Sequence, residues 1–537
     1  MRFSDSPPEA PPRSPLSLGE DRRVSRRGSS VHAAASGIVW VVRVPRGAWL
    51  AAGLLFVVLV AVSGRYGFHR DELYFIEGGH HPAWAQPDNP ILVPLLAAEW
   101  HDLVRGQLWA FRLLPAVAAA LTVVVAAKTS EALGGNRRHQ TAAAAATALT
   151  SIVPATGHLF SITTLDILLT ATTLMLLIRA LHHPGRLAPW LMMGVVAGVA
   201  LEVKVLLLLV LFSCLLAMLL VGPRQPLRQP GPWLAGLVAA VLAAPNLIWQ
   251  GVNGWPMLQI ASNIAGGGSV SSASRYAVVY LHLLLVGPVL TVVLVAGLIT
   301  LSRRASLTPY AWLPIAYFIF LIIVVATGGK PYYLAGFFPA VLAAGSAPVL
   351  DWVRQARSRR IGAAALLSFS CVVTGFLSLP LAPIGSPVYL ISVAVNPDAG
   401  ETVGWDSYVG TVREVAGALP AEERQHAVIL ARNYGEAGAL ARARRLSSQD
   451  AEALPPVFSG HNAFADWGPP PETATTVIMV GNFTAAQLTS WFSGCRRVAE
   501  LESPPGVHNE EDGAPVQVCR GLQRPWTEVW PSVRRVA

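Results

Sequence analysis

Residues 47–75 read GAWLAAGLLFVVLVAVSGRYGFHRDELYF, and this stretch decides the class of fold. Residues 47–64 are mostly apolar, and about 20 residues of that kind allow a helix to cross a bilayer. Asp71 and Glu72 follow directly, at a depth where a carboxylate is partly removed from water. The stretch therefore predicts a membrane helix that delivers two acids to one face of the membrane.

The composition of the whole chain agrees with this prediction. Of 537 residues, 53% are hydrophobic and only 13% are charged, whereas soluble domains carry about 25% charged residues. The net charge of +9 could indicate a nucleic-acid partner. However, the basic residues fall between apolar runs, as they do in proteins that cross a membrane many times. We expect a polytopic membrane protein surrounded by lipid, with no nucleic-acid partner.

Eleven segments are apolar enough to be predicted as transmembrane helices. They are 47–64, 110–128, 141–157, 161–181, 188–202, 204–221, 233–250, 276–300, 310–327, 332–350 and 361–380. Every second loop carries arginine, which is typical of cytoplasmic loops. These arginines are Arg137, Arg138, Arg186, Arg224, Arg228, Arg303, Arg304, Arg354, Arg357, Arg359 and Arg360.

The predicted orientation divides the chain into three parts. Residues 1–46, polar and rich in Pro, Ser and Arg, are expected to form a disordered cytoplasmic tail. Residues 47–380 would form an all-α membrane domain in the inner or plasma membrane. Because eleven spans is an odd number, residues 381–537 would lie outside the cytoplasm.

The part after residue 380 reads as an α/β domain. His426–Ala431 and Thr475–Val480 are short apolar runs that predict buried strands, each followed by a turn and a helix, Glu436–Arg445 and Ala485–Phe492. Cys495 and Cys519 also lie here. An oxidising compartment would permit a disulfide between them, and two free thiols are the alternative.

The outer segment 65–109 is longer than a simple connection needs to be, and it combines acids, histidines and aromatic residues. It contains Asp71, Glu72, the pair His80 and His81, and Asp88. A partly desolvated carboxylate at this position can act as a general base or hold a divalent cation. The alternative is a solvated helix end in which Arg70 pairs with the acids.

Two ionic residues lie inside predicted spans or at their junction. Asp166 lies one or two turns into the fourth span, and Lys204 separates the fifth from the sixth. An ion at this depth normally faces a cavity or a partner. Lys204 would suit a phosphate head group, or it would pair with Glu202 or Asp166, and these interpretations are compatible.

Later outer loops add cations. Arg275 precedes the eighth span, and the stretch GGKPYY, which includes Lys330 and Tyr332, precedes the tenth. Glycines there would let the backbone approach a ligand. Alternatively, Lys330 extends to the membrane surface and the tyrosines form an interfacial belt.

Several segments of the chain resemble those of a known family. The chain is similar to bacterial members of the dolichyl-phosphate-mannose protein mannosyltransferase superfamily, the GT-C fold glycosyltransferases of family 39, which include the aminoarabinose transferases of lipid A. The similarity covers roughly residues 60–350. The matching segments are RDELYF (70–75), DNPILVPLL (88–96), GHLF (157–160) with Asp166, PNLIWQ (245–250), GWP (254–256) and GKPYY (329–333), with NYGEAGA (433–439) and SGHN (459–462) in the tail.

The sequence departs from the family pattern in two places. Asn89 and Ile91 stand where the family usually has Gln and Pro, and Val203 stands where an Asn commonly precedes the Lys. None of these changes removes an acid or a cation, so the choice of substrate is affected more than activity.

The resemblance implies an inverting transferase that takes a sugar from a polyprenyl-phosphate donor. Asp71 would be the general base, and Asp166, Glu72 or Asp88 would orient the acceptor or hold a divalent cation. Lys204, with Lys330 or Arg275, would stabilise the departing phosphate, and Tyr332 and His158 would line the substrate site. Glu72, Asp88, His80 and His81 are the candidate metal ligands. The acceptor would be a lipid, a glycan or a protein.

Two other functions fit parts of the pattern. A secondary transporter would use Asp166 and Lys204 as an ion relay, but such transporters commonly contain internal repeats, and none is found in the sequence. A non-catalytic scaffold that binds a partner through residues 381–537 would leave the outer acids unexplained. We therefore favour the transferase.

Overall fold

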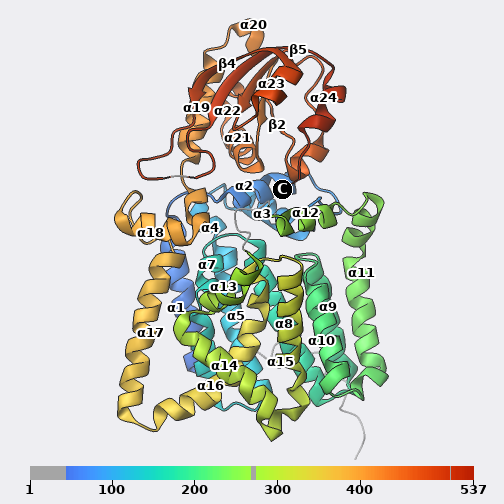
Figure 1. The fold of residues 1–537 in the computed structure, drawn as a ribbon, viewed down its shortest axis with the longest axis vertical. Helices are drawn as coiled ribbons and strands as arrows, with labels where there is room; N and C mark the ends of the chain where they lie inside the picture. Colours follow the sequence, from blue (N-terminus) through green and yellow to red (C-terminus); the bar gives the residue numbers. More distant parts are fainter. Residues whose placement is uncertain (1–43, 268–273, 508, 537) are drawn as a thin grey trace, which may run out of the picture. The chain divides into compact units, whose positions relative to one another are not determined.

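Helices dominate the protein, whose computed structural model describes residues 44–267, 274–507 and 509–536 (Figure 1). Residues 44–536 of this description belong to one compact unit of packed elements. The predicted disordered tail, 1–46, lies outside the described residues apart from its last three.

Every predicted span falls on a helix or on two consecutive helices. Five helices are long and apolar enough to cross a membrane: Leu108–Ala132, Ile162–His182, Pro230–Val252, Pro331–Arg354 and Arg357–Ser378. Four shorter apolar helices are Arg46–Val62, Leu187–Leu201, Leu207–Val221 and Trp312–Ala326. The protein is therefore a multi-pass membrane protein, and the full count of eleven spans stays a prediction.

The labels of these helices follow the chain. They are α1 (Arg46–Val62), α4 (Leu108–Phe111), α5 (Leu113–Ala132), α6 (Arg137–Ala148), α7 (Ile152–Gly157), α8 (Ile162–His182), α9 (Leu187–Leu201), α10 (Leu207–Val221), η2 (Pro226–Arg228), α11 (Pro230–Val252), α13 (Arg275–Val286), α14 (Pro288–Arg303), η3 (Ala305–Tyr310), α15 (Trp312–Ala326), η4 (Pro331–Phe337), α16 (Phe338–Arg354) and α17 (Arg357–Ser378).

The eighth predicted span, 276–300, is not the single straight helix that the sequence led us to expect. It is divided into α13 and α14, which meet at 101°. Gly287 at the break has φ 100°, a conformation that glycine adopts readily. Pro288 follows and has no N–H to continue the helical hydrogen bonding. The Gly-Pro pair therefore bends the chain sharply at this point.

The outer segment 65–109 contains two helices, α2 (Arg70–His80) and α3 (Leu92–Leu103). They lie at one end of the membrane helices, together with α12 (Pro256–Ala265), as Figure 1 shows. The outer segment is thus a folded layer between the membrane helices and the rest of the chain, and not a simple connection.

The tail contains a five-stranded sheet in the order β2-β1-β3-β5-β4. Strands β2, β1 and β3 are parallel, while β5 runs antiparallel to both β3 and β4. This mixed sheet fits the predicted α/β domain. Its strands are β1 (Ala427–Ala431), β2 (Val457–Ser459), β3 (Thr476–Val480), β4 (Phe492–Glu500) and β5 (Pro515–Leu522).

Helices surround the sheet and link it to the membrane part. They are α18 (Pro387–Val395), η5 (Pro397–Thr402), α19 (Trp405–Gly417), α20 (Ala421–Arg424), α21 (Tyr434–Leu446), α22 (Ser448–Ala453), η6 (Asn462–Trp467), α23 (Ala485–Trp491) and α24 (Trp526–Val533). Cys495 and Cys519 are paired across β4 and β5. Of the two alternatives considered for these cysteines, the structure has the disulfide.

The sheet domain is docked on the outer segment through apolar and charged contacts. Phe68 and Leu73 share one buried cluster with Trp405 and Ile429 of the tail. Such a shared core removes apolar surface from water at about 25 cal/mol per Å². The boundary predicted at residue 380 lies just after the end of α17. The sheet domain and the outer segment nevertheless share one buried core.

Candidate active site

The start of α2 places two acids side by side with different surroundings. His69 caps the helix: its Nδ1 accepts the Asp71 N–H at 3.1 Å, and its own N–H donates to the Glu72 carboxylate at 2.8 Å. This reciprocal capping fixes the first turn. Carboxylates are favoured there by the partial positive charge of the helix N-terminus. Asp71 stays half-buried, whereas Glu72 is fully buried.

Glu72 is held by a buried arginine. Arg112 donates from Nε to Glu72 Oε1 at 2.9 Å and from Nη2 to Oε2 at 2.8 Å. The Phe160 N–H donates to Oε1 at 2.8 Å. Burial alone would raise the pKa of Glu72, but the Arg112 charge and these hydrogen bonds lower it. The geometry therefore favours Glu72 as a clamp between the outer segment and the membrane helices, rather than as a proton acceptor.

Asp71 faces the tail domain. The Tyr434 hydroxyl, at the first position of α21, donates to Asp71 Oδ1 at 2.9 Å. Arg70 lies over the Tyr434 ring, 4.9 Å from its centroid. Among the described residues, hydrogen-bond donors reach only Oδ1 of the Asp71 side chain. The second carboxylate oxygen is thus left to accept a proton.

Asp166 and Lys204 form an ion pair inside the helix bundle. Asp166 lies near the N-terminus of α8, which Ser161 caps, and Lys204 lies in the short break between α9 and α10. Lys204 Nζ is 3.5 Å from Asp166 Oδ2, and the Thr170 hydroxyl donates to Oδ1 at 3.2 Å. Of the two partners considered for Lys204, the structure thus selects Asp166 over Glu202.

Aromatic rings and a second lysine lie near this pair. Lys204 Nζ lies 5.2 Å from the ring centroid of Tyr332 and 4.5 Å from that of Tyr333, while Lys330 Nζ lies 5.8 Å from Tyr332. Lys204 and Lys330 therefore lie beside the same Tyr332 ring, and the convergence of Asp71 and Asp166 on one site stays a prediction.

Lys330 is a second cation beside the Tyr332 ring. Burial lowers the pKa of Lys330, and the Asp71 carboxylate opposes that shift. The Lys204 charge acts in the same direction as burial. Two ammonium groups that repel each other at one place form a region suited to an anion with more than one negative charge.

Asp88 lies beside this cluster and also contacts the tail. The Tyr74 hydroxyl donates to its Oδ1 at 2.7 Å, and the Asn462 amide donates to its Oδ2 at 3.0 Å. Burial raises the pKa of Asp88 to about 6, and the nearby Asp71 charge acts in the same direction. Asp88 therefore changes charge closer to neutral pH than an ordinary aspartate does.

Other predicted site residues lie elsewhere. Arg275 is exposed at the first position of α13. His158 is buried, with Nδ1 3.3 Å from the Pro154 carbonyl, and burial lowers its pKa to about 4. His80 Nε2 is 3.0 Å from Asp102, and the His81 ring stacks on Trp467 at 4.0 Å.

The candidate metal ligands are not gathered into one site. Glu72 is occupied by Arg112, and the two histidines have separate partners. In the described parts of the chain, the group of acids or histidines close enough to share an ion is Glu401, Glu510 and Glu511. Arg70 pairs with the first two of these acids. The predicted donor set does not fit a metal, so no step is assigned to one.

Two contributors to the cluster were missed by sequence reasoning alone. Tyr434 and Asn462 reach Asp71 and Asp88 from the tail, across 363 and 374 residues of sequence. The family-like segments NYGEAGA and SGHN contain these two residues and were the available signal. Arg112, which balances Glu72, lay unremarked at the start of an apolar span.

Comparison with known proteins relates this arrangement to a family. Residues 88–249 match the family model described as dolichyl-phosphate-mannose-protein mannosyltransferase. ArnT from Cupriavidus metallidurans bound to undecaprenyl phosphate superimposes with a TM-score of 0.56, covering 90% of this chain and 98% of that chain at 15% identity. The chain has the GT-C glycosyltransferase fold of ArnT.

Further comparisons complete this finding. The apo state of the same ArnT gives a TM-score of 0.55 at 14% identity, again covering 90% and 98% of the two chains. The arabinofuranosyltransferase AftD from Mycobacteria has a TM-score of 0.48 at 14% identity, covering 90% of this chain and 40% of that chain. No curated protein matches the sequence significantly. The family model supports the resemblance to the mannosyltransferase superfamily over residues 88–249, and the similarity to ArnT shows a shared fold.

Proposed function

We propose that the protein transfers a sugar from a polyprenyl phosphate to a hydroxyl acceptor, with inversion at the anomeric carbon. The reaction would take place at the end of the membrane helices covered by the sheet domain, which the loop charges predict to be the outer side. The observation that supports this proposal is the Asp166–Lys204 ion pair, with Lys204 and Lys330 beside the same Tyr332 ring.

Asp71 is proposed as the general base. Its Oδ1 is fixed by Tyr434, and Oδ2 is available to the acceptor hydroxyl. As the acceptor oxygen forms its bond to the anomeric carbon, its proton passes to Oδ2, and the bond from that carbon to the phosphate oxygen breaks. A positioned base of this kind contributes about 10²- to 10⁴-fold to a rate.

Lys204 and Lys330 are proposed to hold the departing phosphate. Negative charge grows on the phosphate as the glycosidic bond breaks, and cations fixed in a dry site stabilise it without reorganising. Tyr332 and Tyr333 hold the Lys204 ammonium through their ring faces. Asp166 orients that ammonium by pairing with it.

The tail domain is proposed to complete the acceptor side of the cluster. It supplies Tyr434 to Asp71 and Asn462 to Asp88. Both contacts come from elements docked on α2, so the acceptor would be bound where the two parts of the chain meet. The relatives' substrates differ, and the identity of the sugar is open to the experiment below.

The carrier lipid is supported by the fold and by the cluster. ArnT was solved with undecaprenyl phosphate bound, and this chain shares its fold over almost the full length. The transporter alternative rests on the same Asp166–Lys204 pair. A transporter would move an ion without consuming a phosphate-linked sugar, which makes the two functions separable by chemistry.

The test begins with the lipids that purify with the full-length protein. They are extracted and identified by mass, and we expect a polyprenyl phosphate carrying a sugar. The identified class is then supplied to the protein in proteoliposomes with a membrane-lipid and glycan fraction as acceptor. Release of unsubstituted polyprenyl phosphate supports transfer. Ion movement across the vesicle membrane without such release would contradict it.

A further inference from the structure

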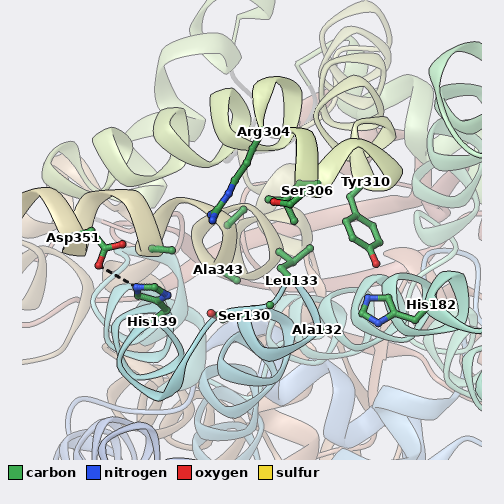
Figure 2. Close-up of a pocket in the computed structure, with 15 residues that line it drawn as sticks. Ser130, Ala132, Leu133, His139, His182, Arg304, Ser306, Tyr310, Ala343 and Asp351 are labelled. Atoms are coloured by element: carbon green, nitrogen blue, oxygen red, sulfur yellow. Dashed lines mark hydrogen bonds and ion pairs between the residues drawn. The ribbon is translucent and has the colours of Figure 1, made fainter. Parts of the chain in front are cut away.

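A cavity of about 400 Å³ lies at the far end of α8 from Asp166. Its walls come from the ends of α5, α8 and α16 and from the segment η3 (Figure 2). Sixteen residues of helix separate Asp166 from His182, which lines the cavity, and at 1.5 Å per residue this is about 24 Å. The cavity is therefore distinct from the candidate active site.

The floor of this cavity carries a buried polar group that no protein atom satisfies. The Ser130 side chain is 1% exposed, and its hydroxyl has no hydrogen-bond partner within the described chain. Figure 2 shows this hydroxyl rising from the floor while Arg304 reaches toward the same space from the opposite wall. A buried hydroxyl left unpaired costs about 1–3 kcal/mol, so it indicates a ligand.

Each remaining polar side chain of the lining can donate a hydrogen bond, except that of Asp351. Arg304, Ser306 and Tyr310 come from one wall, and His182 lies 5.7 Å from the Tyr310 ring. Asp351 is the one carboxylate of the lining, and its Oδ1 is already 3.1 Å from His139 Nε2. A cation would need several free carboxylates. The balance of donors over acceptors selects an anion instead.

The surroundings add charge and apolar surface. Arg303, Arg137 and Arg138 are exposed at the same end of the bundle, and such a belt attracts anionic head groups. Leu133, Leu307 and alanines of α16 form the apolar part of the lining. The arginine of the lining provides a guanidinium, whose fork of donors matches phosphate oxygens.

We propose that this cavity binds a phosphate group, held by Arg304 and by the Ser130 hydroxyl. The phosphate would belong either to the head group of a membrane lipid or to free inorganic phosphate. The cavity volume falls within the range of about 300–1,000 Å³ typical of ligand sites. This site would act independently of the proposed transfer reaction.

The test compares two arginines that are neighbours in sequence. Arg304→Gln removes the guanidinium that lines the cavity, and Arg303→Gln removes the same charge from the exposed end of α14, outside the lining. Each full-length variant is placed in phosphatidylcholine nanodiscs with or without phosphatidylglycerol, and the retained lipid is counted by native mass spectrometry. In a second arm, inorganic phosphate is titrated in phosphatidylcholine nanodiscs while thermal unfolding is followed.

We expect wild-type protein and Arg303→Gln to retain phosphatidylglycerol equally and Arg304→Gln to retain about tenfold less, the size expected for one charge-assisted hydrogen bond. Ser130→Ala should lose about threefold. Retention of phosphatidylglycerol without a response to phosphate identifies a lipid head group. Stabilisation by phosphate that depends on Arg304 identifies the free ion. Equal behaviour of the two arginine variants in both arms would overturn the proposal.

Discussion

The two ends of α8 carry polar clusters of opposite character. Near its N-terminus, Asp166 joins a second carboxylate, two lysines and several aromatic rings, and a separate domain supplies hydrogen bonds to the acids. At its C-terminus, His182 lines a cavity where donors predominate and the single carboxylate is paired. The first arrangement suits the proposed proton transfer and departure of a phosphate. The second suits only the proposed binding of an anion.

The comparison shows why charge alone does not identify a catalytic end. Arginines are more numerous at the C-terminal end of α8, but Arg137, Arg138 and Arg303 lie at the surface outside the cavity lining, where ions are screened and interact weakly. The fewer ions at the other end are buried or half-buried, and Asp166 and Lys204 pair with each other. The burial and pairing of its charged side chains, more than their number, distinguish the proposed active site.

The largest effect is expected for Asp71→Asn. Removal of the base should lower the transfer rate by about 10²- to 10⁴-fold, measured as release of polyprenyl phosphate. Glu99→Gln is the matched control because Glu99 is an exposed carboxylate of the same outer segment. Wild-type rates for folded, membrane-inserted Asp71→Asn would show that the proposed base is misassigned.

Arg112→Met should destabilise the fold without touching the cluster of lysines. It would leave the fully buried Glu72 carboxylate without its partner, and breaking a buried ion pair in this way costs about 3–5 kcal/mol. Thermal unfolding in detergent measures the loss. Arg138→Met, an exposed arginine of α6, provides the reference. An equal unfolding temperature for both variants would contradict the clamp.

Lys204→Ala should raise the concentration of lipid donor needed for half-maximal rate by about tenfold, because a charge-assisted contact to the phosphate is lost. Lys204→Arg keeps the charge and should recover part of the affinity. Titration of the donor at fixed acceptor measures both variants. An unchanged donor requirement would leave Lys204 as a structural partner of Asp166 alone.

Tyr434→Phe should lower the rate by about fivefold, since one hydrogen bond to Asp71 is lost while the ring contacts remain. Tyr66→Phe is the control: it also loses a hydroxyl hydrogen bond, to the Ala382 carbonyl at 2.7 Å, away from the cluster. A steady-state comparison of the two variants distinguishes a positioning role from general loosening of the docked domain. Equal rates for both would argue against positioning.

The smallest effect concerns pH. Asp88 in the folded protein has a pKa of about 6, above the ordinary value for aspartate. Between about pH 4 and pH 6 the folded state therefore holds a proton that the unfolded chain has released, so stability falls as pH rises through this interval. Asp88→Asn should lack this component. If the unfolding temperatures of wild type and variant changed equally with pH across this interval, the pKa assigned to Asp88 would be contradicted.

Much of the fold could be predicted because its signals are local. Apolar runs located every segment of the membrane part, and short apolar runs located β1 and β3 in the tail. The break at Gly287 was overlooked because mean hydropathy does not register a Gly-Pro pair inside an apolar run. Pro288 was the visible signal of this break, since a proline has no N–H with which to continue a helix.

The site was harder to predict because its contacts are distant in sequence. The sequence identified each site residue singly, from a charge at unusual depth: Asp71, Asp166, Lys204 and Lys330. Their spacing along the sequence does not show whether they lie together. Glu72 looked equivalent to Asp71, its neighbour. Only the fold places Arg112 beside one and Tyr434 beside the other, and those partners separate the two acids into different roles.

The contact between Tyr434 and Asp71 also bears on the order in which the protein is synthesised and folds. The two residues are 363 positions apart, and at about 5–20 residues per second a ribosome needs roughly 20–70 s to connect them. The membrane helices that follow α2 are made during that interval, and Asp71 gains its contact with Tyr434 only afterwards. The cluster is assembled only after the last quarter of the chain has emerged and folded, so a prematurely terminated product would reside in the membrane without a finished reaction centre.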